Sequence, residues 1–233
     1  VETGEFHPIQ LVPGIIDLYD DAQMAAAITA EFSKQTLDAR ILAYTNKRVV
    51  EYNDEIRWIR GLPDCYTVGE MLINNQPIPL QRYMLSVEEE VEILSIDPKT
   101  ETIWIDEYQD QTVELEYFKA SIRNRLGMTF HDVKLPVDRA HFAGLLKWLA
   151  AHKKWSKMYD LKKKILDLRQ RDSSTFDKAQ GSSMNTVYID AANLSTCHNA
   201  AQAARRLYVG ASRARKHVVF YGQLADKYGG FIQ

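Results

Sequence analysis

Cysteine is scarce in this sequence, which has only Cys65 and Cys197 among its 233 residues. The two are far apart and lack the close pairing that a zinc site or a small disulfide-stapled domain requires. We therefore expect no disulfide, no bound metal and a reducing, cytoplasmic compartment. No apolar run approaches the ~20 residues that cross a bilayer, and the N-terminus lacks the features of a secretory signal, so no membrane partner is expected.

An excess of charge of either sign is also missing. The formal net charge is −2, so any contact with nucleic acid must use a local surface. Hydrophobic residues make up 45% and charged residues 26% of the chain, which excludes a disordered or fibrous class. The length is enough for one large domain or for two domains of roughly 100 residues each.

A third absence concerns phosphate binding. The sequence contains no Gly-x-x-x-x-Gly-Lys-Ser/Thr loop, whose backbone N–H groups and lysine hold the phosphates of ATP in P-loop NTPases. We therefore expect that this chain alone does not hydrolyse ATP.

The N-terminal part has alternating helix and strand signals. An acidic start and helical spacing predict a helix over 20–32, and a compact apolar run predicts a strand over 40–44. Thr45 and Asn46 can cap a following helix over 47–60. A strand followed at once by a helix is typical of a parallel α/β sheet.

The middle of the chain, residues 62–137, has a different pattern. Short alternating runs at 91–96, 102–105 and 112–115 predict strands, and Asp-Pro-Lys-Thr at 97–100 predicts a hairpin turn. We expect this block to be an inserted antiparallel barrel or meander.

Helical signals return after this block, with helices predicted over 140–152 and 155–168. Buried strands predicted at 186–190 and 217–222 flank a helix over 200–208. The parallel sheet is therefore expected to resume in the C-terminal part.

The most specific motif is Leu-Tyr-Val-Gly-Ala-Ser-Arg-Ala-Arg at 207–215. It resembles the last conserved motif of superfamily 1 DNA helicases, Tyr-Val-Ala, a hydrophobic residue, Thr or Ser, and then Arg-Ala-Arg or Arg-Ala-Lys. In that family the arginine at the position of Arg213 contacts the γ-phosphate of a nucleotide held by the first motor domain. A guanidinium suits this role because it is always charged and grips phosphate oxygens bidentately.

A second motif lies upstream. Residues 174–183, Ser-Thr-Phe-Asp-Lys-Ala-Gln-Gly-Ser-Ser, are similar to the preceding motif of the same family, Thr-x-His-Lys-x-Gln-Gly. The resemblance implies that Thr175 contacts a DNA phosphate, with Lys178 beside it. A hydroxyl and nearby N–H groups suit a phosphate because they bind it without reading the base sequence.

On the nucleotide side, the resemblance implies Gln180, Gly181 and Ser183, together with Arg213. Gly181 taken alone fits a simple turn equally well. Asp177 stands where the family has histidine, and its carboxylate cannot donate a hydrogen bond. Three interpretations stay open: Asp177 faces away from the phosphate, alters coupling, or caps a short helix that follows it.

The third motif, Ala-Tyr-Thr-Asn-Lys at 43–47, resembles the segment that opens the second motor domain in Dda-type phage helicases and RecD relatives. This resemblance places Thr45 and Asn46 on the DNA side. Val-Gly-Glu at 68–70 and Asn-Asn-Gln-Pro at 74–77 are similar to the entry into the SH3-like subdomain of the same helicases.

The fold class that follows from the resemblance is α/β. Residues 1–61 and 138–233 would form a RecA-like second motor domain, and residues 62–137 an inserted SH3-like antiparallel β-barrel over the single-stranded DNA.

Several residues could carry further chemistry but have a simpler interpretation. Burial tendencies favour the core of the barrel for Trp104, Tyr108 and Tyr117 over base stacking. The lysine-rich stretch over 153–164 could follow a DNA backbone, but charged runs on helices are usually solvated faces.

Ile-Trp-Ile-Asp-Glu at 103–107 looks like the magnesium-binding Asp-Glu motif of the superfamily. Its place argues against that role, because no phosphate-binding loop precedes it and it lies in the antiparallel block. We therefore do not assign Asp106 and Glu107 to a metal site.

Together these motifs predict part of an ATP-dependent DNA helicase that moves 5′ to 3′ on single-stranded DNA. ATP and Mg²⁺ would be bound mainly by a first motor domain outside this sequence. That domain, single-stranded DNA and replication or recombination proteins are the expected partners, at the nucleoid of a bacterial or phage-infected cell. Two alternatives stay open: a non-catalytic nucleic-acid-binding module of the same fold, and an autonomous nuclease or NTPase using Asp106 and Glu107.

Overall fold

The computed structural model describes residues 6–36, 38–108 and 111–232. None of the helices in these ranges is long and apolar enough to cross a membrane.

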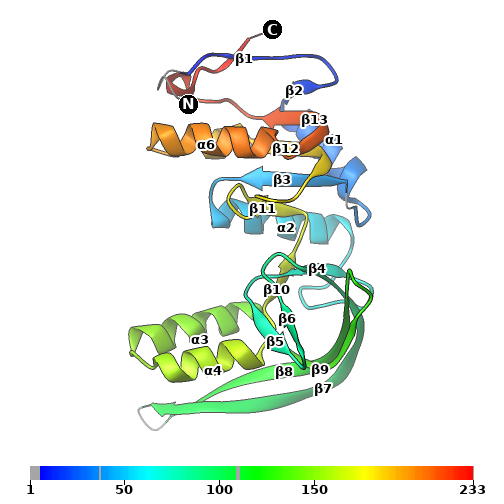
Figure 1. Cartoon of the computed structure of the whole chain (residues 1–233), viewed down its shortest axis with the longest axis vertical. Helices are drawn as coiled ribbons and strands as arrows, with labels where there is room; N and C mark the ends of the chain where they lie inside the picture. Colours follow the sequence, from blue (N-terminus) through cyan, green and yellow to red (C-terminus); the bar gives the residue numbers. More distant parts are fainter. Residues whose placement is uncertain (1–5, 37, 109–110, 233) are drawn as a thin grey trace. The chain divides into compact units, whose positions relative to one another are not determined.

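The chain forms two compact units (Figure 1). Residues 1–62 and 171–233 make up the first, which we call the parallel-sheet unit, and residues 63–170 make up the ribbon unit. The ribbon unit begins at Pro63, one residue after the start expected at 62. Its end differs from the expected boundary at residue 138, because helices α3 (Arg139–Ala151) and α4 (Trp155–Lys164) pack against strands of the ribbon unit.

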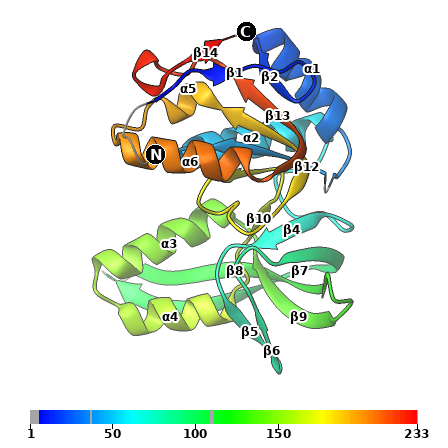
Figure 2. The ribbon, with the colours of Figure 1, turned by 45° about the horizontal axis from the view of Figure 1, so that its top comes forward.

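The parallel-sheet unit contains a five-stranded sheet in the order β11-β3-β12-β13-β2, and every neighbouring pair is parallel (Figure 2). Its strands are β2 (Ile16–Tyr19), β3 (Ala39–Ala43), β11 (Ser173–Thr175), β12 (Met184–Asp190) and β13 (Ala214–Tyr221). All five residues of β3 are buried, which explains the apolar run over 41–43. The predicted parallel α/β fold is confirmed.

Helices cover both faces of this sheet. One face packs on α1 (Asp21–Phe32) and α2 (Asn46–Ile59), and the other on α5 (Ala191–Leu194) and α6 (Ala200–Ala211). Each helix begins at a side chain that accepts a hydrogen bond from its first turn; in α1 the cap Asp20 forms a capping box with Gln23.

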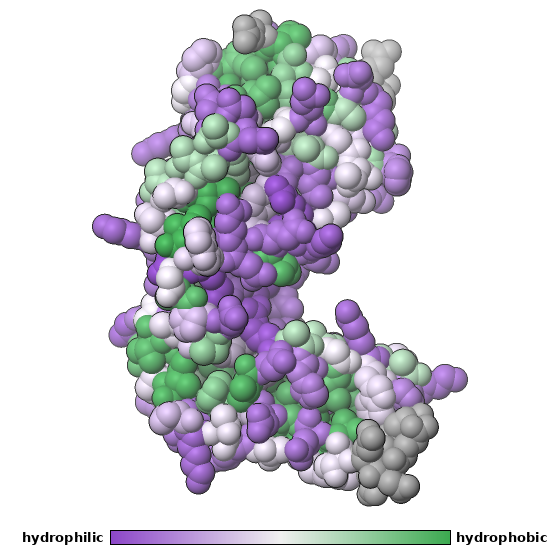
Figure 3. Space-filling model, turned by 180° about the vertical axis from the view of Figure 1, so that it is seen from behind, coloured by the Kyte–Doolittle hydropathy of each residue, from purple (hydrophilic) through white to green (hydrophobic). Residues whose placement is uncertain are grey.

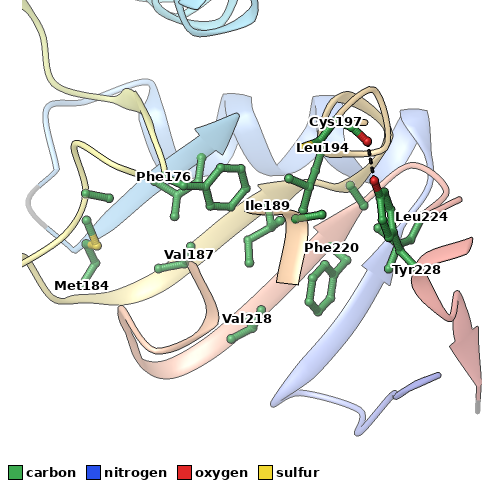
Figure 4. Close-up of a cluster of buried hydrophobic side chains, with 14 residues drawn as sticks. Phe176, Met184, Val187, Ile189, Leu194, Cys197, Val218, Phe220, Leu224 and Tyr228 are labelled. Carbon is green, nitrogen blue, oxygen red and sulfur yellow. Dashed lines mark hydrogen bonds between the residues drawn. The ribbon is translucent and has the colours of Figure 1, made fainter. Parts of the chain in front are cut away.

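The core on the α5 and α6 face is drawn in Figure 4. The Tyr228 hydroxyl donates a hydrogen bond to the carbonyl oxygen of Cys197, which satisfies the one polar atom of that buried ring. Gly210 lets α6 approach the sheet closely, because a Cβ there would lie 2.8 Å from Cε1 of Phe176.

The chain ends near its beginning in this unit. Strand β1 (Ile9–Gln10) pairs with β14 (Phe231–Ile232), which follows the short 3-10 helix η1 (Asp226–Tyr228).

The ribbon unit contains a five-stranded antiparallel sheet in the order β10-β4-β7-β8-β9, with a separate hairpin of two strands. The sheet strands are β4 (Met71–Asn74), β7 (Glu90–Tyr108), β8 (Gln111–Asn124), β9 (Thr129–Pro136) and β10 (Leu168–Gln170). The hairpin consists of β5 (Ile78–Leu80) and β6 (Tyr83–Leu85). The predicted antiparallel block is confirmed, whereas a closed barrel is not found among the described residues. An isolated bridge joins Lys134 of β9 to Ile165, which lies between α4 and β10.

The prediction of a hairpin turn at 97–100 is wrong. Residues 97–99 form an irregularity inside β7, which continues to Tyr108 in pairing with β8. The Asp97 carboxylate accepts a hydrogen bond from the backbone of Lys99 at 2.9 Å, so the turn-forming residues make a local bulge.

Helices α3 and α4 pack on the half of the β7–β8 ribbon that contains Ile105 and Leu115. Phe142 and Leu149 from α3 and Leu161 from α4 meet Ile105 and Leu115 of the two long strands. The surface of both units alternates small hydrophobic patches with hydrophilic ones on the face drawn in Figure 3.

Candidate functional site

Three of the residues predicted to contact DNA lie at the carboxyl edge of the parallel sheet. Thr175 ends β11 and pairs in register with Ala43, the last residue of β3. Thr45 and Asn46 follow β3 at the start of α2. The structure therefore brings together residues that are about 130 positions apart in sequence.

Thr45 and Asn46 differ in what their side chains do. The Thr45 hydroxyl caps α2, accepting a hydrogen bond from the backbone N–H of Arg48 at 3.3 Å. Asn46 is exposed at the first helical position, where backbone N–H groups and the helix dipole favour an anion. In the described part of the chain the hydroxyl of half-buried Thr175 has no hydrogen-bond partner, so it is available for a ligand.

Asn193 is a central residue of this edge that sequence reasoning missed. Its Oδ1 accepts hydrogen bonds from the backbone N–H groups of Tyr44 at 2.8 Å and Thr45 at 2.9 Å. These bonds fix the turn between β3 and α2. The sequence signal is Asp-x-x-Asn at the end of a buried strand, which is an N-cap pattern.

Asp190 holds Asn193 in place by a hydrogen bond. It is buried at the end of β12, and its Oδ1 accepts a hydrogen bond from the backbone N–H of Asn193 at 2.7 Å. Its Oδ2 accepts from Nε of Arg48 at 2.9 Å and from the hydroxyl of Tyr52 at 2.7 Å. Burial and the Asp190 carboxylate raise the pKa of Tyr52, so that hydroxyl remains a donor.

Asp177 lies at the same edge and forms an ion pair. Its Oδ2 is 3.0 Å from Nη2 of Arg206 in α6, and the guanidinium of Arg206 stacks 5.0 Å from the ring centroid of Tyr44. Residues 176–181 form turns, so the idea that Asp177 caps a helix is wrong. Lys178, in the same turn, is half-buried.

The nucleotide-side candidates lie at the opposite, amino edge of the sheet. Arg213 lies between the end of α6 and the start of β13, and its backbone carbonyl accepts a hydrogen bond from the backbone N–H of Met184, the first residue of β12. Its guanidinium reaches back to the loop before β12, where Nη1 donates to the carbonyl oxygen of Ser182 at 3.4 Å.

The loop before β12 exposes the other candidates on this side. Gln180, Gly181 and Ser183 are exposed, and Gly181 has φ of +91°, a conformation that side chains disfavour. Arg213 is half-buried, and its Nε and Nη2 donate to the carbonyl of Val209 and the hydroxyl of Ser212. All predicted nucleotide residues thus share one edge.

Asp106, the first residue of the Asp-Glu segment in the ribbon unit, has a structural role. Asp106 is buried, forming ion pairs with Lys154 and with Lys157, the latter at 2.8 Å. The side chain of Glu107 lies outside the described residues. Within the described part of the chain, no three ligating side chains gather to hold a metal.

The aromatic residues of the ribbon unit divide in two. Tyr117 is buried, as predicted, whereas Trp104 is 61% exposed, contrary to the expectation. Lys157 covers the Trp104 ring, with Nζ 5.2 Å from its centroid. The side chain of Tyr108 lies outside the described residues.

These features define an α/β domain with polar clusters at the two ends of a parallel sheet, joined to an antiparallel unit. Residues 172–221 match the family model of the UvrD-like helicase C-terminal domain. The match runs from β11 to β13 and includes Thr175 and Arg213.

Solved structures of helicases are also similar to the chain. Pif1 helicase from Bacteroides, in complex with ADP-AlF3 and ssDNA, has 11% identity and a TM-score of 0.45, over 88% of this chain and 46% of that one. Pif1 helicase from Candida albicans has 11% identity and a TM-score of 0.40, over 91% and 51%. The chain thus spans about half the length of these structures. No curated protein matches it.

Proposed function

We propose that this chain is the second motor part of an ATP-dependent DNA helicase, and that Arg213 is its arginine finger. The observation that carries the proposal is the grouping of Arg213 with the loop over 180–183 at the amino edge of the sheet, inside the region that matches the helicase family model. A half-buried guanidinium with neutral partners retains its charge for a phosphate.

In this function the residues on the two edges do different work. Arg213 would stabilise the charge that develops on the γ-phosphoryl oxygens, while the exposed backbone around Gly181 approaches the nucleotide. ATP and Mg²⁺ would be held mainly by a first motor domain. Closure of the two motor domains on ATP and reopening after hydrolysis would move the DNA strand.

The carboxyl edge would hold single-stranded DNA. Thr175 offers a hydroxyl that has no partner within the described ranges, and Asn46 lies at the N-terminus of α2, where a phosphate is favoured. Lys178 adds a positive charge nearby. None of these groups reads bases, as expected for a motor that must pass over any sequence.

The narrower proposal is a 5′ to 3′ helicase of the Dda and RecD branch, with the ribbon unit as its SH3-like insertion. The motifs at 43–47 and 68–70 support it. We place the parent protein at the nucleoid, with replication or recombination proteins as partners.

The test uses the parent protein with its first motor domain. Arg213→Ala should lower DNA-stimulated ATP turnover by about 10³-fold, the scale of a lost arginine finger, while leaving binding of single-stranded DNA intact. Arg215→Ala, two residues on and exposed, is the matched control and should retain turnover. Turnover of Arg213→Ala equal to that of the control would overturn the assignment.

A further inference from the structure

Positive charge is concentrated in the α3–α4 hairpin. Residues 139–164 contain eight Lys and Arg residues and a single acidic residue, Asp160, whereas the whole chain has a net charge of −2. Lys154 and Lys157 form ion pairs with Asp106, whereas the lysines at the C-terminal end of α4 have no carboxylate partner among the described residues. The local field of this hairpin is therefore opposite in sign to that of the chain as a whole.

Helix α4 exposes aromatic rings where an ordinary amphipathic helix exposes polar groups. It buries Met158 and Leu161 against the ribbon. On its outer side Trp155 is 49% and Tyr159 56% exposed. Neither ring stacks on another aromatic ring in the described part of the chain.

The two rings form a stripe with lysine. Trp155 and Tyr159 are four residues apart and so lie on one helix face, about 6 Å apart along the axis. The next position of that stripe is Lys163, with Lys162 beside it, and Lys163 is exposed. We call Trp155, Tyr159, Lys162 and Lys163 the α4 stripe.

We propose that the α4 stripe binds single-stranded nucleic acid, with bases stacked on Trp155 and Tyr159 and backbone phosphates near Lys162 and Lys163. Flat rings alternating with ammonium groups match a chain of bases and phosphates, and stacking tolerates any base. An acidic peptide would use the charges without the ring faces, whereas single-stranded nucleic acid uses both. The inference rests on the proposed function, to which it adds a second contact with the strand.

The experiment measures binding of a fluorescein-labelled oligo-dT to the full chain by anisotropy at fixed salt. The double variant Trp155→Ala with Tyr159→Ala should bind at least about tenfold more weakly, because each stacked base contributes substantially to affinity. The double variant to Phe keeps both rings and should bind nearly as tightly as the wild type. Trp58→Ala removes a ring that is 80% exposed on α2 and is the matched control.

The outcomes separate this inference from the proposed function. If the double Ala variant binds oligo-dT as tightly as the Trp58→Ala control, the α4 stripe is not a nucleic-acid site. That result leaves the Arg213 test of turnover unaffected. A loss that is equally large for heparin, which has charge but no bases, would also overturn the stacking proposal. Loss for oligo-dT with retention for heparin supports it.

Discussion

The two edges of the parallel sheet are built in different ways. At the carboxyl edge, Asp190 and Asn193 form a chain of short hydrogen bonds that ends on the backbone of Tyr44 and Thr45. At the amino edge, Arg213 is held by two carbonyl oxygens at 3.2 Å and 3.4 Å and by the hydroxyl of Ser212. The first arrangement fixes a turn, and the second leaves a charged group that can change partners.

This difference suits the two proposed ligands. A DNA track benefits from a rigid edge, because its contacts must be in place at every step. An arginine finger must leave its resting partners when a nucleotide arrives, so long bonds to neutral groups cost little to break. Variants at each edge should therefore differ in what they change.

The largest effect on stability is expected at Asp190. Asp190→Ala removes the acceptor for Asn193, Arg48 and Tyr52, two of which lie in or near the core. Leaving buried donors without an acceptor should cost about 3 kcal/mol of unfolding free energy, measured by urea denaturation. Asp177→Ala breaks an exposed ion pair and should cost less than about 1 kcal/mol. Equal losses would mean that the hydrogen bonds of Asp190 contribute no more to the unfolding free energy than an exposed ion pair.

A smaller loss is expected at Asn193. Asn193→Ala removes the acceptor of two backbone N–H groups and should cost about 2 kcal/mol. Hydrogen exchange at Tyr44 and Thr45 should become faster, since their amide protons lose their partner. Asn193→Asp keeps the Oδ1 acceptor and should keep both amides protected. Unchanged exchange in the Ala variant would show that the turn is held by other contacts.

Local sequence patterns predicted β3, β12 and β13, which are apolar runs, and the helices with caps such as Asp20 and Thr45, but not the short strands β2 and β11. The strands of the ribbon unit were harder to predict. Strand β7 runs through Pro98, and residues that favour turns made a bulge instead. Helical periodicity also gave the apolar face of α3 and α4 but not the sheet it covers, because the partner of an apolar face is a tertiary choice.

In the candidate site, too, residues in local motifs could be predicted, whereas residues with distant partners could not. Thr175 and Arg213 could be predicted as candidates because their motifs are local, and the structure places them at the carboxyl edge and the amino edge of the sheet. Asn193 was missed because its partners, Tyr44 and Thr45, lie almost 150 positions away in sequence. The ion pair between Asp177 and Arg206 was not predicted for the same reason, because Arg206 lies on α6, in a different segment of the sequence.

The smallest effect on stability is expected at the amino edge. Arg213→Ala gives up three bonds to groups that water can replace, on a half-buried side chain, so its free energy of unfolding should stay within about 0.5 kcal/mol of the wild type. Urea denaturation of the chain alone measures this without ATP. A loss as large as that of Asn193→Ala would make Arg213 a structural residue, and a fall in turnover in its variant would then no longer identify a finger. Unchanged stability with lost turnover in the parent would mean that this edge is built for a ligand.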